Sequence, residues 1–288
     1  MLGGRFGEQS DDTSRRLLDD HVAAGGRFVE TASAYADGAA ERALGAALRT
    51  LPDDVLCVTK VGHPRAGRTD VEHARIPAEI DQSRRRLGRD VLDLVLLHRD
   101  APGVEVEVLL GPLLNAAHKG DVAAIGVANW SAERLVQALS LAASAGVPLA
   151  AASAHLSLAT CVRPLWPGVV AADTALLAVH ARQELPLLAW SANARGWFSG
   201  RLLDPAHPDA DARRAFDTPR NRRRLRHCRY LANALGTTPT CVALAWTLRR
   251  HPFAAAVVGP ATPDELRDAI AAASLTLPDD AISALDAL

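Results

Sequence analysis

The sequence predicts a single-domain (β/α)₈ barrel that spans residues 1–288. Short apolar runs alternate with longer amphipathic stretches along the chain, which is the pattern of βαβ units around a parallel sheet. The runs are apolar on both faces, as strands of a covered parallel sheet are. The length of 288 residues, 49% of them hydrophobic, is typical of a barrel that occupies a whole chain.

Seven runs have the length and composition of strands. They are RFVET (27–31), VLCVTK (55–60), VLDLVLLH (91–98), VAAIGVA (122–128), LAAASA (149–154), LPLLAW (185–190) and AAAVVG (254–259). An eighth strand would have to come from MLGGRFG at the start of the sequence, which is short and rich in glycine. We therefore expect a shortened or missing N-terminal hairpin and first strand, arising either from a real truncation or from a start assigned too late.

Helical patterns lie between the apolar runs, and several begin with capping residues. The patterns cover 12–24, 39–51, 76–87, 104–119, 132–145, 171–183, 220–235 and 263–273. Ser131 and Thr238-Pro239 are typical N-caps, and Thr262-Pro263-Asp264-Glu265 has the spacing of a capping box. Residues 155–170 and 191–219 interrupt the alternation as loops on the carboxyl side of strands, where barrel enzymes form their sites.

An open, doubly wound sheet is the structural alternative to the barrel. Against it, no GxGxxG joins a first strand to a first helix, and no change of composition divides the chain into two domains. HExxH, GxSxG and GxxxxGK[ST] are also absent, so zinc protease, esterase and P-loop chemistry have no support.

Composition bounds the partners of the chain. The net charge of −1 gives no support for binding to nucleic acid or a membrane through overall charge, and we interpret the basic run at 220–229 as a solvated helix face. The sequence starts without the features of a signal peptide, so we expect a cytoplasmic location. Four scattered cysteines without a CxxC pair favour packing thiols over a metal site.

Lysine and tyrosine are scarce in this chain. Of the 32 Lys and Arg residues only Lys60 and Lys119 are lysines, and Tyr35 and Tyr230 are the two tyrosines. Arginine has replaced lysine wherever a positive charge suffices, so a retained lysine is more often one that is needed as an amine.

Polar residues stand at the carboxyl ends of successive predicted strands. They are Glu30, Thr31, Lys60, His98, Asn129, Ser153, His155, Trp190 and Gly259, with Tyr35 shortly after the first of these strands. Polar groups at the same end of seven strands indicate a catalytic face. We expect the Lys60 ammonium to lower the pKa of the Tyr35 phenol, making it a general acid, with His98 orienting a carbonyl and Glu30 pairing with Lys60.

These residues carry a resemblance to a known family. FVETASAY (28–35), VTK (58–60), LVLLHRD (94–100), IGVANW (125–130), LLAWSANARGWFSGR (187–201) and VVGPATPDEL (257–266) resemble the aldo-keto reductase superfamily, in order along essentially the whole chain. The likeness is greatest to the group related to potassium-channel β-subunits. It implies a barrel that binds extended NADPH, with Tyr35 as proton donor, Lys60 depressing its pKa, His98 as orienting partner and Glu30 at the aspartate position.

The resemblance also implies a set of cofactor-binding residues. Asn129 would hold the nicotinamide carboxamide, and Ser153 stands at the position of the glutamine that usually does so but is too short to make the same bond directly. Trp190 would stack on the nicotinamide ring. The pyrophosphate would be lined by Ser191, Arg195 and Gly196, and the adenosine end by Gly259, Thr262 and Arg267. The chain departs from the family pattern at Glu30, where aspartate is usual, at Ala128 for serine, at Ser153 for glutamine and at Ala261 for a basic residue. These departures predict weaker or rearranged cofactor binding, or a specialised substrate.

Two functions follow from these observations. The first is NADPH-dependent reduction of a small-molecule aldehyde, ketone or keto-sugar carbonyl, with NADH as an alternative cofactor and no metal. The second is a catalytically weak barrel that senses a nicotinamide nucleotide or binds a partner. The identity of the substrate and the oligomeric state are not encoded in any pattern that we can interpret.

Overall fold

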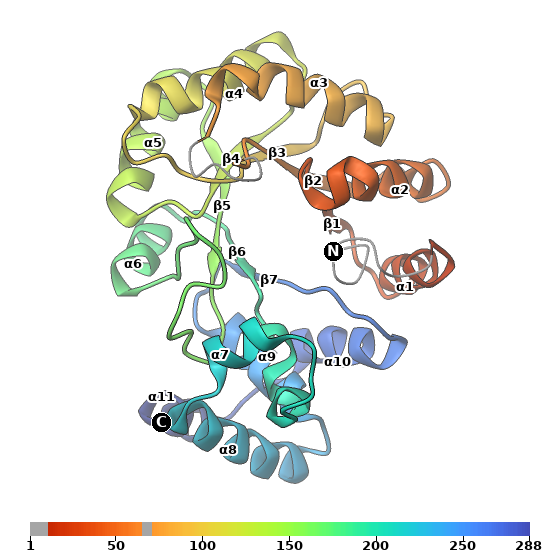
Figure 1. The fold of residues 1–288 in the computed structure, drawn as a ribbon, viewed down its shortest axis with the longest axis vertical. Coiled ribbons are helices and arrows are strands. Elements are labelled where there is room, and N and C mark those ends of the chain that lie inside the picture. The colour runs from red at the N-terminus through yellow and green to blue at the C-terminus, as the bar shows by residue number, and fades with distance from the viewer. Residues whose placement is uncertain (1–10, 65–70) are drawn as a thin grey trace.

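The computed structural model describes residues 11–64 and 71–288. Within them, seven parallel strands form one sheet in the order β1 to β7, so each strand lies beside its neighbours in the chain (Figure 1). The strands are β1 (Phe28–Glu30), β2 (Leu56–Val61), β3 (Leu94–Leu97), β4 (Ile125–Ala128), β5 (Leu149–His155), β6 (Leu187–Trp190) and β7 (Ala254–Val257). Each lies in, or overlaps by all but one residue, a run expected to be a strand.

The sheet is a nearly closed barrel. Among the described strands, β1 pairs with β2 alone and β7 with β6 alone, so the sheet has two edges. The alternation of strands and helices follows the order of a (β/α)₈ barrel, which confirms the predicted fold class. The expected shortened hairpin and first strand fall on residues 1–10, outside the described part of the chain.

Helices surround the sheet (Figure 1). They are α1 (Asp11–Ala23), α2 (Ala39–Leu48), α3 (Ile76–Leu87), α4 (Val106–Lys119), α5 (Ala132–Ser144), α6 (Thr174–Arg182), α7 (Ala210–Phe216), α8 (Pro219–Leu235), α9 (Pro239–Arg249), α10 (Pro263–Ser274) and α11 (Asp279–Ala287). The predicted caps are confirmed, since the hydroxyls of Ser131, Thr238 and Thr262 accept from the backbone N–H three residues later. Among the helices described, none is long and apolar enough to cross a bilayer.

The structure corrects three parts of the helix prediction. The segment 191–219, expected to be a loop, contains α7, and α9 and α11 lie where no helical pattern was evident. Helix α9 is buried at every position from Cys241 to Thr247, so it lacks the polar face that makes a helix visible as a period. Its proline at the first turn and the cap at Thr238 were its remaining signals.

The basic run at 220–229 lies on α8, and its arginines are exposed, as expected, apart from Arg224. Arg224 is buried and donates hydrogen bonds to the Leu158 carbonyl and to Thr160, so it fastens α8 to the loop after β5.

The hydrophobic core has two main parts. One lies between the strands and helices α2 to α6. The other gathers around α9, where α7, α8 and α11 meet the segment after β6 (Figure 1). The long segment after β6 is therefore held by its own core on one side of the strand ends.

Candidate functional site

A cavity of about 1030 Å³ opens at the carboxyl ends of the strands. Residues from β1, β2 and the segments that follow β3 to β7 line it together. This is the end of a parallel barrel at which active sites form. Every expected catalytic residue (Glu30, Tyr35, Lys60 and His98) lines this cavity.

Strand alternation explains how Lys60 and His98 come to point inward. Successive side chains of a strand face opposite sides, so Lys60 shares the inner face of β2 with Val58. In the same way His98, two residues after Leu96, faces inward with it. The backbone N–H of His98 donates to the Val61 carbonyl at 2.7 Å. Thr59 faces the other way, where its hydroxyl donates to Glu41 of α2. The ammonium and the imidazole are therefore neighbours on one rim.

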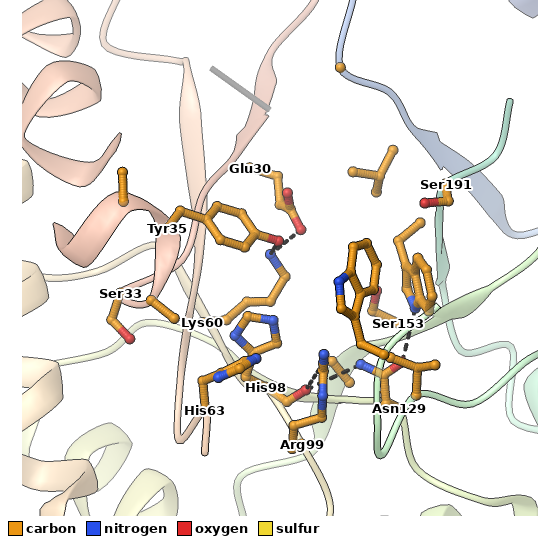
Figure 2. A pocket seen from close by; sticks show the side chains of 18 of the residues that line it. Glu30, Ser33, Tyr35, Lys60, His63, His98, Arg99, Asn129, Ser153 and Ser191 are labelled. Atoms are coloured by element: carbon orange, nitrogen blue, oxygen red, sulfur yellow. Dashed lines mark hydrogen bonds and ion pairs between the residues drawn. The ribbon is translucent and has the colours of Figure 1, made fainter. Parts of the chain in front are cut away.

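The Lys60 ammonium joins the catalytic candidates. It is ion-paired with Glu30, and it donates to the Tyr35 hydroxyl at 3.1 Å and to the Thr31 carbonyl at 2.9 Å (Figure 2). Lys60 is buried, whereas the other lysine, Lys119, and the other tyrosine, Tyr230, are exposed. Burial therefore distinguishes Lys60 from the lysine and tyrosine that lie outside the site. The extra methylene of Glu30 relative to aspartate does not prevent the pair with Lys60.

Lys60 acts on the Tyr35 pKa in the expected direction, but the expected net lowering of that pKa is wrong. Burial, and then the Glu30 carboxylate, raise the pKa of Tyr35 above its ordinary value, although Lys60 and Arg99 act to lower it. The physical reason is that burial disfavours the charged phenolate, and the Glu30 carboxylate disfavours it further, which together outweigh the charge and the hydrogen bond of Lys60. Tyr35 is therefore held in its protonated form, which is the form a proton donor requires.

His98 lies beside Tyr35, with ring centroids 5.8 Å apart in an edge arrangement. Burial, followed by the charges of Lys60 and Arg99, lowers the pKa of His98 well below its ordinary value, so the ring is neutral. A neutral imidazole carries one N–H, which is a donor for a carbonyl oxygen. Its Nδ1 atom is buried without a hydrogen-bond partner in the described structure.

Asn129 and Ser153, expected at the carboxamide, bond protein groups here. The Asn129 amide donates to the His98 carbonyl at 3.2 Å, and its oxygen accepts from Trp190 Nε1 at 3.0 Å. The Ser153 hydroxyl donates to the Leu188 carbonyl at 2.8 Å. Asn129 thus ties the ends of β3, β4 and β6 together and fixes the edge of the Trp190 indole.

The expected pyrophosphate residues lie on the opposite side of the cavity from Tyr35. Ser191 and Arg195 line it, while Gly196 lines a smaller depression beside it. Arg195 is ion-paired with Asp209 at 2.6 Å. Arg201, which the sequence did not single out, lines both the cavity and the smaller depression. It is ion-paired with Glu265 at 2.8 Å.

The expected adenosine residues are not all brought together. Gly259 lines the cavity, but the Thr262 hydroxyl caps α10 and Arg267 is an exposed residue paired with Asp264 of the same helix. The Glu265 carboxylate accepts from the Ala261 N–H at 2.7 Å, and Glu265 lines the cavity.

Strained backbone gathers around this cavity. Non-glycine residues with positive φ include Ala36, Asp37, Asn129, Ser191 and Arg195, which all line it. Such conformations cost about 1–3 kcal/mol each and persist where the surroundings impose them. Their concentration here supports a functional site.

Lining residues that the sequence did not single out include His63, Arg99 and Trp166. His63 and Arg99 each lie two residues after the end of a strand, β2 and β3, so their positions were a usable signal. Trp166 belongs to the loop after β5, and its ring centroid is 6.0 Å from that of Trp190, with the Arg195 guanidinium 5.4 Å from its own centroid. Nothing in a loop sequence predicts that contact.

Extended NADPH fits the residues present. The cavity runs from the Tyr35–Lys60–His98 cluster to a rim with two arginines, and its volume is at the upper end of the range for ligand sites, about 300–1,000 Å³. The unpartnered His98 Nδ1 and Glu30 Oε2 atoms are buried at the reacting end. The acidic partners of Arg195 and Arg201 would have to exchange for phosphate oxygens.

Known proteins show the same organisation. Residues 1–288 match the model of the Aldo/keto reductase family. The chain is 26% identical to "Aldo-keto reductase str7" of Strobilurus tenacellus over 287 residues, which cover 96% of this chain and 81% of that protein.

Solved structures agree on the fold. One is the thermostable aldo-keto reductase Tm1743 in complex with the inhibitor epalrestat, with a TM-score of 0.73, 21% identity and coverage of 97% of this chain and 88% of that one. Another is named for 2,5-diketo-D-gluconic acid reductase B, with a TM-score of 0.73, 23% identity and coverage of 97% and 84%.

The family model covers the whole chain, and the fold and the clustered Tyr35, Lys60 and His98 are consistent with it. The general chemistry of such enzymes is the reduction of carbonyl groups with a nicotinamide cofactor. This chain is an oxidoreductase and belongs to the aldo/keto reductase family.

Proposed function

We propose that the protein reduces an aldehyde, ketone or keto-sugar carbonyl to an alcohol, with NADPH as hydride donor and Tyr35 as proton donor. The observation that carries the proposal is the contact of Lys60 Nζ with both Glu30 and the Tyr35 hydroxyl, beside a neutral His98 (Figure 2). When bound, NADPH would supply the hydride that reaches the carbonyl carbon.

Hydrogen-bond polarity supports Tyr35 as the donor. An ammonium can only donate, so the Tyr35 oxygen accepts from Lys60 and its own proton is directed elsewhere. A carbonyl oxygen placed between Tyr35 and His98 would receive two hydrogen bonds, and these strengthen as the oxygen gains negative charge. The raised pKa of Tyr35 keeps its proton available until the alkoxide forms.

The cofactor assignment rests on the two rim arginines. Arg195 and Arg201 are suited to the phosphates of a nicotinamide cofactor, and the choice of NADPH over NADH follows the family resemblance of the sequence. Asn129, Trp190 and Ser153 would form the nicotinamide end. The structure named for a diketo acid reductase supports a carbonyl substrate by analogy of fold.

The decisive experiment combines cofactor binding with turnover. NADPH and NADH are titrated separately against the protein by nicotinamide fluorescence, and a panel of aldehydes and ketones is assayed with each cofactor. We expect micromolar NADPH binding and turnover of at least one carbonyl. Binding without turnover on any carbonyl would favour the sensor alternative, to which the protein-bonded Asn129 and Ser153 side chains give some support.

Tyr35→Phe tests the proton donor. The substitution removes the hydroxyl and keeps the ring, so we expect kcat to fall by about 10²–10⁴-fold with NADPH affinity little changed. Steady-state kinetics and the fluorescence titration measure the two quantities. Full turnover in Tyr35→Phe would overturn the assignment of the donor while leaving the reductase itself standing.

A further inference from the structure

We propose that Arg99 binds a carboxylate on the carbonyl substrate, so that the enzyme acts on oxo acids. The inference rests on the proposed function, since it names the substrate class of the same cavity. Arg99 follows His98 after β3, is 7% exposed and lines the cavity. Figure 2 shows its side chain directed into the cavity between His98 and Asn129.

Arg99 lacks an acidic partner in the described structure, unlike the other basic side chains near it. Its recorded hydrogen bond runs from Nη1 to the His98 carbonyl at 3.0 Å. The following residue, Asp100, also lines the cavity, but its carboxylate is paired with Arg134 at 2.7 Å. The other lining cations have carboxylates, in the pairs Lys60–Glu30, Arg75–Glu72, Arg86–Glu41, Arg195–Asp209 and Arg201–Glu265.

A guanidinium this deeply buried is costly to leave without a counter-ion, because the low-dielectric interior does not solvate its charge. Gly168, from the loop after β5, lies against the Arg99 methylenes, where an added Cβ would be 3.6 Å from Cδ. The stem of Arg99 is therefore covered while its head reaches the cavity. An anion that enters with the substrate would supply the missing charge.

The position of Arg99 assigns this anion to the substrate and not to the cofactor phosphates. The guanidinium lies at the reacting end, since its Nη1 atom donates to the His98 carbonyl at 3.0 Å and its side chain is directed between His98 and Asn129 (Figure 2). Arg195 and Arg201, the candidates for phosphate, are in the segment after β6 and are already paired. The planar fork of arginine matches a carboxylate through two parallel hydrogen bonds.

The first test compares each oxo acid with its own neutral amide. Wild-type enzyme is assayed with NADPH on pyruvate and pyruvamide, and on succinic semialdehyde and its primary amide. We expect kcat/KM for at least one acid to exceed that for its amide by about tenfold to hundredfold, the effect of a charge-assisted hydrogen bond. A ratio near one for both pairs would overturn the proposal.

The variant Arg99→Gln should bring this acid-to-amide ratio close to one, and Arg99→Lys should retain part of it. The ratio is the readout because any change that Arg99 makes to Tyr35 or His98 affects acid and amide alike and cancels. Arg250→Gln, which removes a charge from the exposed Arg250–Asp286 pair between the end of α9 and α11, is the matched control and should keep the wild-type ratio. Retention of the ratio in Arg99→Gln would exclude Arg99 as its source.

A binding experiment decides the matter without turnover. Benzoate and benzamide are titrated with and without NADP⁺, following tryptophan fluorescence, since Trp166 and Trp190 line the cavity. We expect benzoate to bind at least tenfold more tightly than benzamide in the wild type, and equally weakly in Arg99→Gln. If no carbonyl is reduced, the proposed function fails; if benzoate shows no advantage, the role of Arg99 fails, whatever the activity.

Discussion

At the scale of single residues, one buried ammonium serves two oxygens with different roles. Glu30 balances the charge of Lys60, and Tyr35 receives a hydrogen bond from it. The Glu30 carboxylate raises the pKa of Tyr35, whereas the Lys60 ammonium acts to lower it. The protonation of Tyr35 is set by this balance and by burial, and not by Lys60 alone.

Glu30→Gln should move the alkaline limit of carbonyl reduction to lower pH. Reduction requires protonated Tyr35, so activity falls as the pH rises through the pKa of Tyr35, and removing the Glu30 charge lowers that pKa. The pH profile of kcat measures the shift. Asp37→Asn removes an exposed carboxylate of the same cavity and should leave the alkaline limit of the pH profile unchanged. A shift in Asp37→Asn equal to that in Glu30→Gln would contradict the specific role of Glu30.

At the scale of elements, the site depends on how closely α2 approaches α3. An added Cβ at Gly45 of α2 would lie 2.4 Å from the Arg86 carbonyl and 2.8 Å from Leu87 Cα, both backbone atoms of α3. Close approach lets buried Glu41 of α2 accept from Arg86 and from Thr59 of β2. This buried network fixes the strand that carries Lys60 against its two covering helices.

Gly45→Ala should destabilise the protein by about 1–3 kcal/mol, the usual penalty of an overpacked contact, because backbone cannot yield as a side chain does. Urea unfolding gives the free energy. Gly103→Ala is the control: nothing lies within 4 Å of its added Cβ and its φ is not positive, so we expect a change within about 0.5 kcal/mol. Equal effects of the two substitutions would show that the α2–α3 contact is not tight.

At the scale of the whole molecule, buried neutral histidines couple the fold to pH. Burial lowers the pKa of His98, His155, His180 and His251, that of His155 to about 4. The unfolded chain, with histidine pKa values near 6.5, therefore binds more protons than the folded chain below that pH. Stability from these residues is present above about pH 6.5 and is lost as the pH falls toward the folded values.

The free energy of unfolding should be lower at pH 5.5 than at pH 7.5, and His155 alone should account for about 1.4 kcal/mol of the difference. Urea titrations at the two pH values measure it. His155→Phe keeps an aromatic ring between Trp190 and Phe216 and should reduce the difference by this amount, whereas exposed His118→Gln should not. An unchanged difference in His155→Phe would refute the assignment.

Some elements and residues of this protein were predictable from the sequence and others were not. Seven strands were predictable because parallel strands buried on both faces form unbroken apolar runs, and α9 was not, because a helix buried all round has no polar face. Lys60 and His98 were predictable from strand alternation. Strand alternation would place the Asn129 side chain on the outward face with Ile125 and Val127, so alternation does not predict its position on the cavity wall. Its backbone leaves the strand conformation, with a φ of 63°.

The sequence by itself determined the barrel, the rim on which Tyr35, Lys60 and His98 lie, and the family, because period, strand ends and motifs are local properties of the chain. Tertiary structure decided the rest. The pairing of Arg195 with Asp209, the contact of Trp166 with Trp190 and the isolation of Arg99 from Asp100 depend on loops that pack across the cavity. Even the sign of the Tyr35 pKa shift was decided there, since burial and the position of Glu30 outweigh Lys60.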